Sequence, residues 1–366
     1  MSTIVPDPIV RNVTTTYSHV PSTILATSRQ LQDLARFCNT SPTHDSTFIG
    51  FDKTFNLSEL HVTASVYKNL AVKRITTNDH PIFLGPCFLH GNSDFETYNT
   101  YFNYLSLHLS SPIIGSDGEG GLVKAIRHSF PTSHHLTCTR HLRTNAMDQL
   151  KDKIGLPHQA RQLLLSHIFG DDGITATTNQ LAFEHRLQQT TDHITAVAPA
   201  FIAYFNQRIV PGLRNNLAAQ HAHASSTRPS FTKWTNNNCE SINNVLKTQL
   251  DWKAQNPMDL VDSLHQLITR QHKQVERAIV GQGDFYLTKP YQKYKITINA
   301  WASLTDDQRS RHLDKFYRAA AVTDPRMVIS SDGHAVIAPQ HGGRKPHQVK
   351  RPRAERATTV LKKRKV

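Results

Sequence analysis

A strand-like segment that ends at an acidic residue and a glycine-rich turn constrains the fold of this sequence most. Residues 112–117 read PIIGSD; Gly-Glu-Gly-Gly follows at once, and apolar side chains then recur at helical spacing over 122–130. A second short apolar segment, HHLTC, occupies 134–138. A strand, a helix and another strand in succession predict a parallel pair joined by a crossover helix, with Asp117 at the rim of the sheet.

Three further strand-like segments precede this unit. The segment 46–52 is a short apolar run that ends in Asp52, the segment 59–68 alternates apolar and polar side chains, and the segment 80–89 is apolar around a Gly-Pro pair. Alternation is the period of a half-buried strand, so these segments predict an antiparallel meander.

A helix is expected between the meander and Asp117. Ser93 and Glu96 have the spacing of a capping box, and apolar side chains recur every three or four residues from 95 to 109. The order β-β-β-α-β-α-β predicts an α/β fold, a mixed sheet flanked by helices.

Helical patterns dominate after residue 140. A long amphipathic stretch over 197–217 contains Pro199 and Pro211 as expected breaks, and Asn256 and Thr305 are expected helix caps. We expect an N-terminal polar and helical segment (1–44), the first part of the α/β core (45–145), an all-α insertion (146–232), the closing helices of the core (233–285), a C-terminal helical region (286–343) and a basic disordered tail (344–366).

The positive charge is unevenly placed. Residues 344–366 hold ten Lys or Arg and one acid, so they carry +9 of the net charge of +14. The ending KKRKV is typical of a nuclear localisation signal or of a phosphate-binding arm, and we therefore expect a nuclear protein. No apolar stretch approaches the ~20 residues of a membrane span, and the four cysteines show no paired spacing, which favours a reducing compartment.

Carboxylates at strand ends suit metal chemistry. If the strands that end at Asp52 and Asp117 are neighbours, the two side chains lie side by side, and Glu240, near the start of a helix, is the best third candidate. Two Mg²⁺ or Mn²⁺ ions about 4 Å apart need several such oxygen ligands. Each residue taken alone also has a plainer interpretation as a turn, cap or helix-dipole acid.

The sequence resembles the transposase domain of Mutator-like DNA transposons over roughly residues 45–250. The resemblance lies in FDKTF, which contains Asp52, in SDGEGGLVKAIRHSFP, which contains Asp117, and in NNNCESINN, which contains Glu240. The block around Asp117 is followed by a Cys-x-x-His pair, Cys138 and His141, as in that family.

The resemblance implies an RNase H-like fold and a DDE transposase. Asp52, Asp117 and Glu240 would be catalytic residues that bind two Mg²⁺ or Mn²⁺ ions, with Asp52 bridging both. The chain would cleave DNA at transposon ends and join it to a target, with DNA as its partner. A homodimer is ordinary for this class.

Cys138 and His141 leave two interpretations open. They are half of a zinc site if His134, His135 or Cys239 completes it, but the absence of a second close pair does not favour zinc. A buried thiol and a hydrogen-bonded histidine near the active site are the preferred alternative. Trp234 is expected in the core rather than stacked on a base.

The zinc fingers that usually flank this domain are not visible in the sequence. The chain is then a truncated copy, a lineage that binds DNA differently, or a host-adopted, non-catalytic nuclear DNA-binding protein. In each case the insertion, the basic tail or a partner protein would recognise the transposon ends. A nuclease without strand-transfer activity is the third alternative.

Overall fold

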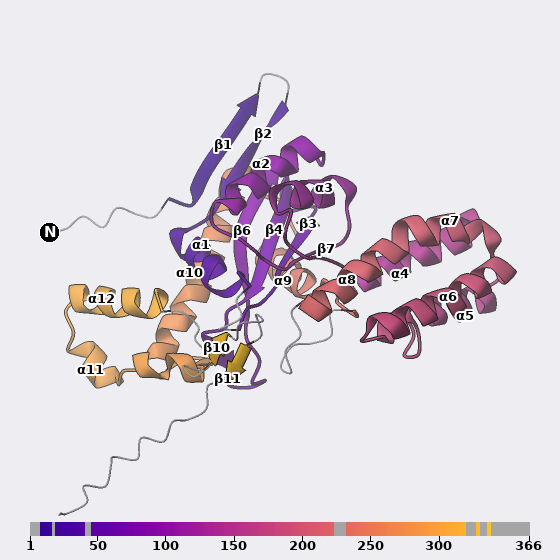
Figure 1. Ribbon diagram of the computed structural model, residues 1–366. Coiled ribbons are helices and arrows are strands. Elements are labelled where there is room, and N and C mark those ends of the chain that lie inside the picture. Colours follow the sequence, from indigo (N-terminus) through magenta and orange to yellow (C-terminus); the bar gives the residue numbers. More distant parts are fainter. Residues whose placement is uncertain are drawn as a thin grey trace, which may run out of the picture.

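A mixed β-sheet forms the centre of the molecule. The computed structural model describes residues 8–16, 19–40, 45–222, 232–319, 327–329 and 335–337. The strands of the sheet are β1 (Val10–Thr16), β2 (His19–Leu25), β3 (Ile49–Thr54), β4 (His61–Lys68), β6 (Ile82–His90), β7 (Ile114–Ser116) and β8 (His135–Thr137). These seven strands lie in the order β1-β2-β6-β4-β3-β7-β8 (Figure 1).

The sheet changes from antiparallel to parallel at β3. Strands β3, β4 and β6 pair as an antiparallel meander, whereas β3 pairs in parallel with β7, and β7 with β8. The predicted meander, the following strand–helix–strand unit and the mixed α/β sheet are therefore confirmed.

Two strands extend the sheet where a polar and helical segment was expected. Strand β2 pairs antiparallel with β6 and β1 pairs with β2, so that Ile24 and Leu25 are buried against the core. The prediction for residues 1–44 was incomplete because the Ser- and Thr-rich composition hides the alternation, and pairing with β6 stabilises the strands. The helix expected at 28–38 is present and begins at a Thr27–Gln30 capping box.

Helices cover both faces of the sheet. They are α1 (Ser28–Phe37), α2 (Phe95–Ser106), α3 (Gly120–Ser129), α9 (Asn237–Gln249) and α10 (Pro257–Ile279). Helices α1, α2 and α3 share one core with Phe51, whereas α9 and the first half of α10 pack on Val62, Ala64 and Val66 of β4. Asn256 caps α10 as predicted.

The cap of α2 differs from the prediction. The N-cap is Asp94, whose carboxylate accepts a hydrogen bond from the backbone N–H of Thr97 at 2.8 Å. Ser93 instead accepts a hydrogen bond from Nζ of Lys53 at 2.9 Å. Asp caps a helix as well as Ser does, and the lysine fixes Ser93 outside the helix.

A helical segment extends away from the sheet (Figure 1). Its elements are α4 (Thr139–Asp148), a π-helical turn (Gln149–Lys153), α5 (His158–Phe169), a 3₁₀ turn (Ile174–Ala176), α6 (Gln180–Val197), a 3₁₀ turn (Pro199–Phe201), α7 (Ile202–Tyr204), a second π-helical turn (Phe205–Ile209) and α8 (Val210–Ala222). It has a hydrophobic core of its own around Phe183, Phe201 and Phe205. The predicted break at Pro199 is present, and Pro211 lies in the first turn of α8.

Helix α8 returns to the sheet through Asn216. Its side-chain oxygen accepts a hydrogen bond from the backbone N–H of Thr137 at 2.8 Å, and its side-chain nitrogen donates to the carbonyl of Thr137 at 2.9 Å. These bonds satisfy backbone groups at the edge strand β8 and anchor the helical segment beside the ends of β7 and β8.

The C-terminal region contributes to two small two-stranded sheets and adds two short helices. The elements are β5 (Val72–Arg74), β9 (Phe285–Leu287), a 3₁₀ turn (Lys289–Tyr294), α11 (Ile298–Ala302), α12 (Asp306–Tyr317), β10 (Met327–Ile329) and β11 (Ala335–Ile337). Strand β5 pairs with β9 and β10 pairs with β11, and the expected Thr305–Gln308 capping box begins α12. The basic tail 344–366 lies outside the described residues.

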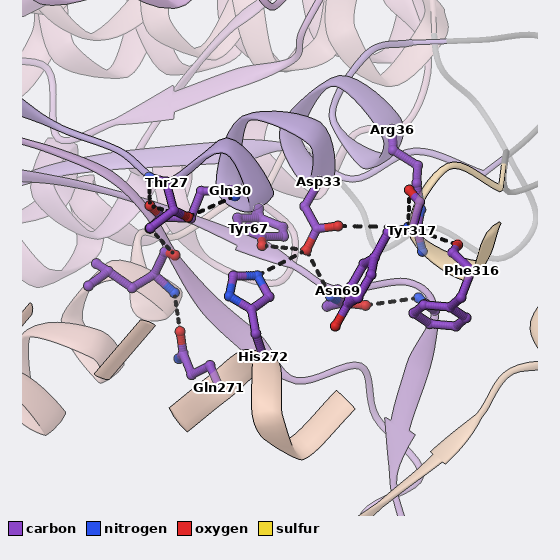
Figure 2. Close-up of polar contacts among 12 residues, drawn as sticks. Thr27, Gln30, Asp33, Arg36, Tyr67, Asn69, Gln271, His272, Phe316 and Tyr317 are labelled. Carbon is purple, nitrogen blue, oxygen red and sulfur yellow. Dashed lines mark hydrogen bonds and ion pairs between the residues drawn. The ribbon is translucent and has the colours of Figure 1, made fainter. Parts of the chain in front are cut away.

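A buried polar cluster joins α1, β4 and α10 (Figure 2). Oδ2 of Asp33, whose residue is fully buried, accepts hydrogen bonds from Tyr67 at 2.9 Å and Asn69 at 3.2 Å, and it lies 3.4 Å from Nε2 of His272. Arg36 donates to the carbonyl of Tyr317 at 2.8 Å, which also ties α12 to α1. The cluster thus holds the C-terminal helices on the core.

No helix in the described part of the chain combines the length and apolar character that a membrane crossing requires.

Candidate active site

The register between β3 and β7 brings the first two predicted acids together. Gly50 pairs with Gly115 and Phe51 with Ser116 in parallel register, so the next position along each strand is Asp52 and Asp117. Side chains two residues apart on a strand share a face. A pair of glycines is therefore followed, on one face of the sheet, by a pair of carboxylates.

The two glycines allow the covering segment to approach closely. A Cβ on Gly50 would lie 2.8 Å from Sγ of Cys239, and a Cβ on Gly115 would lie 2.2 Å from the ring of Trp234. Both distances are shorter than any real carbon contact, so larger residues would displace the chain around 234–239. The glycines thus set how close α9 lies to the acidic pair.

Helix α9 is held on Asp52 by two asparagines. Asn236 donates from Nδ2 to Oδ1 of Asp52 at 3.1 Å, and Asn243 donates from Nδ2 to Oδ2 at 2.7 Å. Positions 236, 240 and 243 share one helical face. Glu240 therefore lies on the same face of α9 as the two residues that hold Asp52.

The carboxylates influence one another electrostatically. Burial raises the pKa of Asp52 to about 7, and the negative charges of Asp117 and Glu240 add to that rise. The charge of His141 and the hydrogen bond from Asn243 act in the opposite direction. Asp117 and Glu240 thus both lie within electrostatic range of Asp52.

Glu240 has a cationic partner in this arrangement. Its Oε1 accepts a short hydrogen bond from the guanidinium of Arg140, and the side chains of Arg140 and Glu240 are 55% and 28% exposed. Among the described residues, no three His, Cys, Asp or Glu side chains are grouped as ligands of one metal ion. The structure therefore joins Asp52 and Asp117 closely and directs Glu240 towards Arg140.

The donor set fits a divalent cation in part. Asp52 and Asp117 offer hard oxygen ligands, and their repulsion, seen in the raised pKa of Asp52, is what a cation between them would relieve. The side-chain oxygens Oδ1 of Asn236 and Asn243 are buried and have no hydrogen-bond partner among the described atoms. Glu240 can join this set only after its ion pair with Arg140 opens.

Cys138 and His141 lie beside this region. Burial alone would raise the pKa of Cys138, but hydrogen bonds from His141 and from the backbone N–H of Asn236, at 3.3 Å, outweigh it and lower the pKa. The bond to Cys138 and the charges of Asp117 and Asp52 raise the pKa of His141. The pair thus joins the start of α4 to the start of α9 and adds positive charge near the acids.

The other residues considered for zinc have different roles. Nε2 of His135 lies 2.8 Å from Oγ of Ser116, and Cys239 packs over Gly50. His134 supplies the carbonyl that accepts a hydrogen bond from the N–H of Ile114. Trp234 is buried and packs edge-on against Phe48, as its predicted core position required.

Two site residues escaped the sequence analysis. Asn236 is the N-cap residue of α9, but its side chain makes no capping bond and holds Asp52 instead. Arg140 lies between Cys138 and His141, and a cation next to this motif is the sequence feature that could have indicated a partner for one of the acids. The loop after Asp117 is also fixed from behind, because Glu119 accepts hydrogen bonds from Lys53 at 2.8 Å and Tyr98 at 3.0 Å.

Searches of protein-family models and of curated proteins find no match to this chain. The resemblance to Mutator-like transposases therefore stays a prediction that rests on the motifs around Asp52, Asp117 and Glu240.

Proposed function

We propose that this chain is an RNase H-like DNA transposase that cleaves DNA strands and joins them by metal-dependent phosphoryl transfer. The observation that carries the proposal is the β3–β7 register, which makes Asp52 and Asp117 neighbours on one face of the sheet. The change from an antiparallel meander to parallel strands at β3 supports the RNase H-like assignment.

Each site residue has a role in this proposal. Asp52 and Asp117 would hold Mg²⁺ or Mn²⁺, and Glu240 would complete the site. When bound, the ions activate a water or a DNA 3′-hydroxyl and stabilise the leaving oxygen of an in-line displacement. Asn236 and Asn243 orient the carboxylate of Asp52 from both sides.

Arg140 controls the availability of Glu240 in this proposal. Because the guanidinium is half exposed, it can exchange the carboxylate of Glu240 for a DNA phosphate without breaking core packing. Substrate binding would then release Glu240 towards Asp52. The protein would gain its third ligand only when DNA is present.

A non-catalytic DNA-binding derivative is the second candidate. The ion pair between Glu240 and Arg140 favours it, because a carboxylate paired with arginine is less available to a metal ion. In that case Asp52 and Asp117 would be remnants of a catalytic site, and the nuclear and DNA-binding expectations would stand without strand cleavage.

A cleavage and joining assay tests the proposal. The full chain is incubated with a labelled duplex and a target plasmid in Mg²⁺ or in EDTA, as wild type, Asp52→Asn, Asp117→Asn and the exposed control Asp148→Asn. We expect Mg²⁺-dependent nicking and joining by wild type and Asp148→Asn, and a loss of at least ~10³-fold in both site variants, since removing a group essential to the transition state costs several kcal/mol.

Three other outcomes have distinct meanings. Nicking without joining identifies a nuclease. DNA binding without nicking identifies the non-catalytic derivative. Equal nicking by Asp52→Asn, Asp117→Asn and wild type, with unchanged circular dichroism, would show that these carboxylates are not the catalytic site.

A further inference from the structure

A groove lies on the side of α9 away from the carboxylates. It encloses about 740 Å³ between α9, α10 and the ends of β5, β6 and β9. None of Asp52, Asp117 and Glu240 lines it. The groove is therefore a separate surface feature, although the helix that carries Glu240 forms one of its walls.

The spacing of residues on α9 separates the two surfaces. Ser241, Val245 and Thr248 line the groove and lie on a different face of the helix from Asn236 and Asn243, which hold Asp52. Asn244, one helical turn after Glu240, lines the groove at the border between the two faces. Val245 is 44% exposed, which is unusual for an apolar residue between two helices. This face of α9 has no covering element among the described residues.

The groove carries an excess of positive charge. Its charged lining residues are Arg74, Arg270 and Asp284, and an adjoining hollow of about 630 Å³ along α10 adds Lys273 and Arg277. Within the described part of the chain, none of these four cations forms an ion pair. Arg270 donates one N–H group to Gln249, and its remaining donors are available.

A side-chain amide in the groove also lacks a partner. Oε1 of Gln274, which lines both hollows, is buried without a hydrogen-bond partner among the described atoms. The two ends of a side-chain amide are assigned from surrounding hydrogen bonds, so the NH₂ group can take either side. Gln274 therefore adds a polar side chain to the wall shared by the two hollows.

We propose that this groove, together with the adjoining hollow along α10, binds the phosphate backbone of duplex DNA. Arg270, Lys273 and Arg277 follow one face of α10 at spacings of three and four residues. Seven residues of helix rise ~10 Å, which is the axial length of about three phosphates of one strand. These three cations are regularly spaced along the helix and form no ion pair among the described residues. They therefore match the regular phosphates of DNA better than the irregularly placed carboxylates of a folded acidic protein.

The groove would hold DNA beside the cleavage site rather than in it. This inference rests on the proposed function only for the choice of DNA as the nucleic acid. Because no base-reading arrangement is required, the contacts would position the duplex and not select its sequence.

Salt-dependent binding of a fluorescent 30-base-pair duplex to the full chain, followed by anisotropy in EDTA, tests the proposal. The groove variant is Arg270→Gln/Lys273→Gln/Arg277→Gln, and the matched control is Arg311→Gln/Lys315→Gln/Arg318→Gln on the exposed side of α12. All proteins contain the same basic tail. We expect the groove variant to bind at least 10-fold more weakly at ~100 mM salt, with a log–log salt slope shallower by about 2 to 3.

The control variant should keep the wild-type slope and an affinity within twofold of wild type. A groove variant with the wild-type slope and melting temperature, or a control with an equal loss, would overturn the proposal. Displacement of the duplex by poly-glutamate at a lower charge concentration than unlabelled duplex would assign the groove to an acidic protein. Binding by the exposed control Asp148→Asn should equal wild type. Because the assay runs in EDTA, a failure of the proposed metal-dependent catalysis leaves this test unaffected.

Discussion

The buried Asp33 and the partly buried Asp52 lie on opposite faces of the sheet and have opposite electrostatic surroundings. Burial would raise the pKa of Asp33, but the close contact with His272, the charge of Arg36 and the hydrogen bond from Tyr67 outweigh it, and the pKa is lowered. Burial also raises the pKa of Asp52, where the charges of Asp117 and Glu240 add to the rise. Burial is common to both sites, so the neighbouring residues decide the sign.

The difference distinguishes a structural carboxylate from one arranged for chemistry. Asp33 is surrounded by donors and cations from α1, β4 and α10, and its ionised form stabilises the fold (Figure 2). Asp52 and Asp117 are brought together by strand register in spite of their repulsion. A bound cation would offset the repulsion between these two carboxylates. Carboxylates with strongly shifted pKa values are concentrated at functional sites.

The largest effect is expected at the structural site. Asp33→Ala leaves Arg36 and His272 without their buried partner, and breaking such a pair costs about 3 to 5 kcal/mol of the free energy of unfolding. Urea unfolding at pH 7 measures it, with the exposed Asp262→Ala as control. Because the pKa of Asp33 is lowered, its ionic stabilisation is present above the unfolded pKa of about 3.9 and is lost as pH falls through the folded pKa.

A loss below about 1 kcal/mol in Asp33→Ala, or an equal loss in Asp262→Ala, would show that the paired cluster does not stabilise the fold and would remove one side of the comparison.

The second prediction concerns Asp52, whose effect on the pH dependence of stability is opposite to that of Asp33. The folded pKa of Asp52, about 7, exceeds the unfolded value, so the native state binds more protons between pH 4 and pH 7 and loses stability as pH rises through that window. Asp52→Asn removes this loss. We expect the variant to be more stable than wild type at pH 8 in EDTA by roughly 1 kcal/mol or more, since one pKa unit corresponds to about 1.4 kcal/mol.

The same variant should differ little from wild type at pH 4, where Asp52 is protonated, and Asp148→Asn should differ little at either pH. Thermal unfolding at the two pH values gives the measurement. An Asp52→Asn protein that is less stable than wild type at pH 8 would contradict the repulsion among the three acids.

The acidic pair and the Asp33 cluster also differ in how well they can be predicted from the sequence. The order of strands over 46–138 and the adjacency of Asp52 and Asp117 followed from local patterns, because each strand carries its own apolar period and its own terminal acid. The Asp33 cluster did not, because its partners come from 36, 67, 69 and 272 and only packing unites them. Local sequence patterns predict individual helices and strands, whereas side-chain clusters depend on how distant helices and strands pack against one another.

The same limit explains the remaining errors. The hairpin β1–β2 depends on pairing with β6, so its Thr-rich segments gave no separate signal. Asn236 resembles a helix cap in sequence, and only the proximity of β3 turns its side chain to Asp52. Arg140 meets Glu240 across 100 positions of sequence, a distance over which no local pattern extends.

A third, smaller effect concerns the response of the acidic pair, Asp52 and Asp117, to metal. At ten times its dissociation constant, Mg²⁺ stabilises the folded chain by about 1.4 kcal/mol, which corresponds to a rise of about 2 °C in melting temperature for a chain of this length. Wild type should show this rise and Asp117→Asn should not, with K⁺ at equal ionic strength as the salt control. An equal rise in Asp117→Asn would place any metal away from the acidic pair.

The smallest effect concerns Arg140, which pairs with Glu240 as Arg36 pairs with Asp33 in the structural cluster. Exposed ion pairs contribute about 0.2 to 1 kcal/mol, so Arg140→Ala should free Glu240 and tighten Mn²⁺ binding by roughly 1.5- to 5-fold in calorimetric titrations without DNA. Arg143→Ala, also exposed on α4, is the control and should leave the affinity unchanged. Weaker Mn²⁺ binding by Arg140→Ala would show that the guanidinium organises Glu240 for metal rather than competing for it, and the contrast between the two sites would then depend on Asp117 alone.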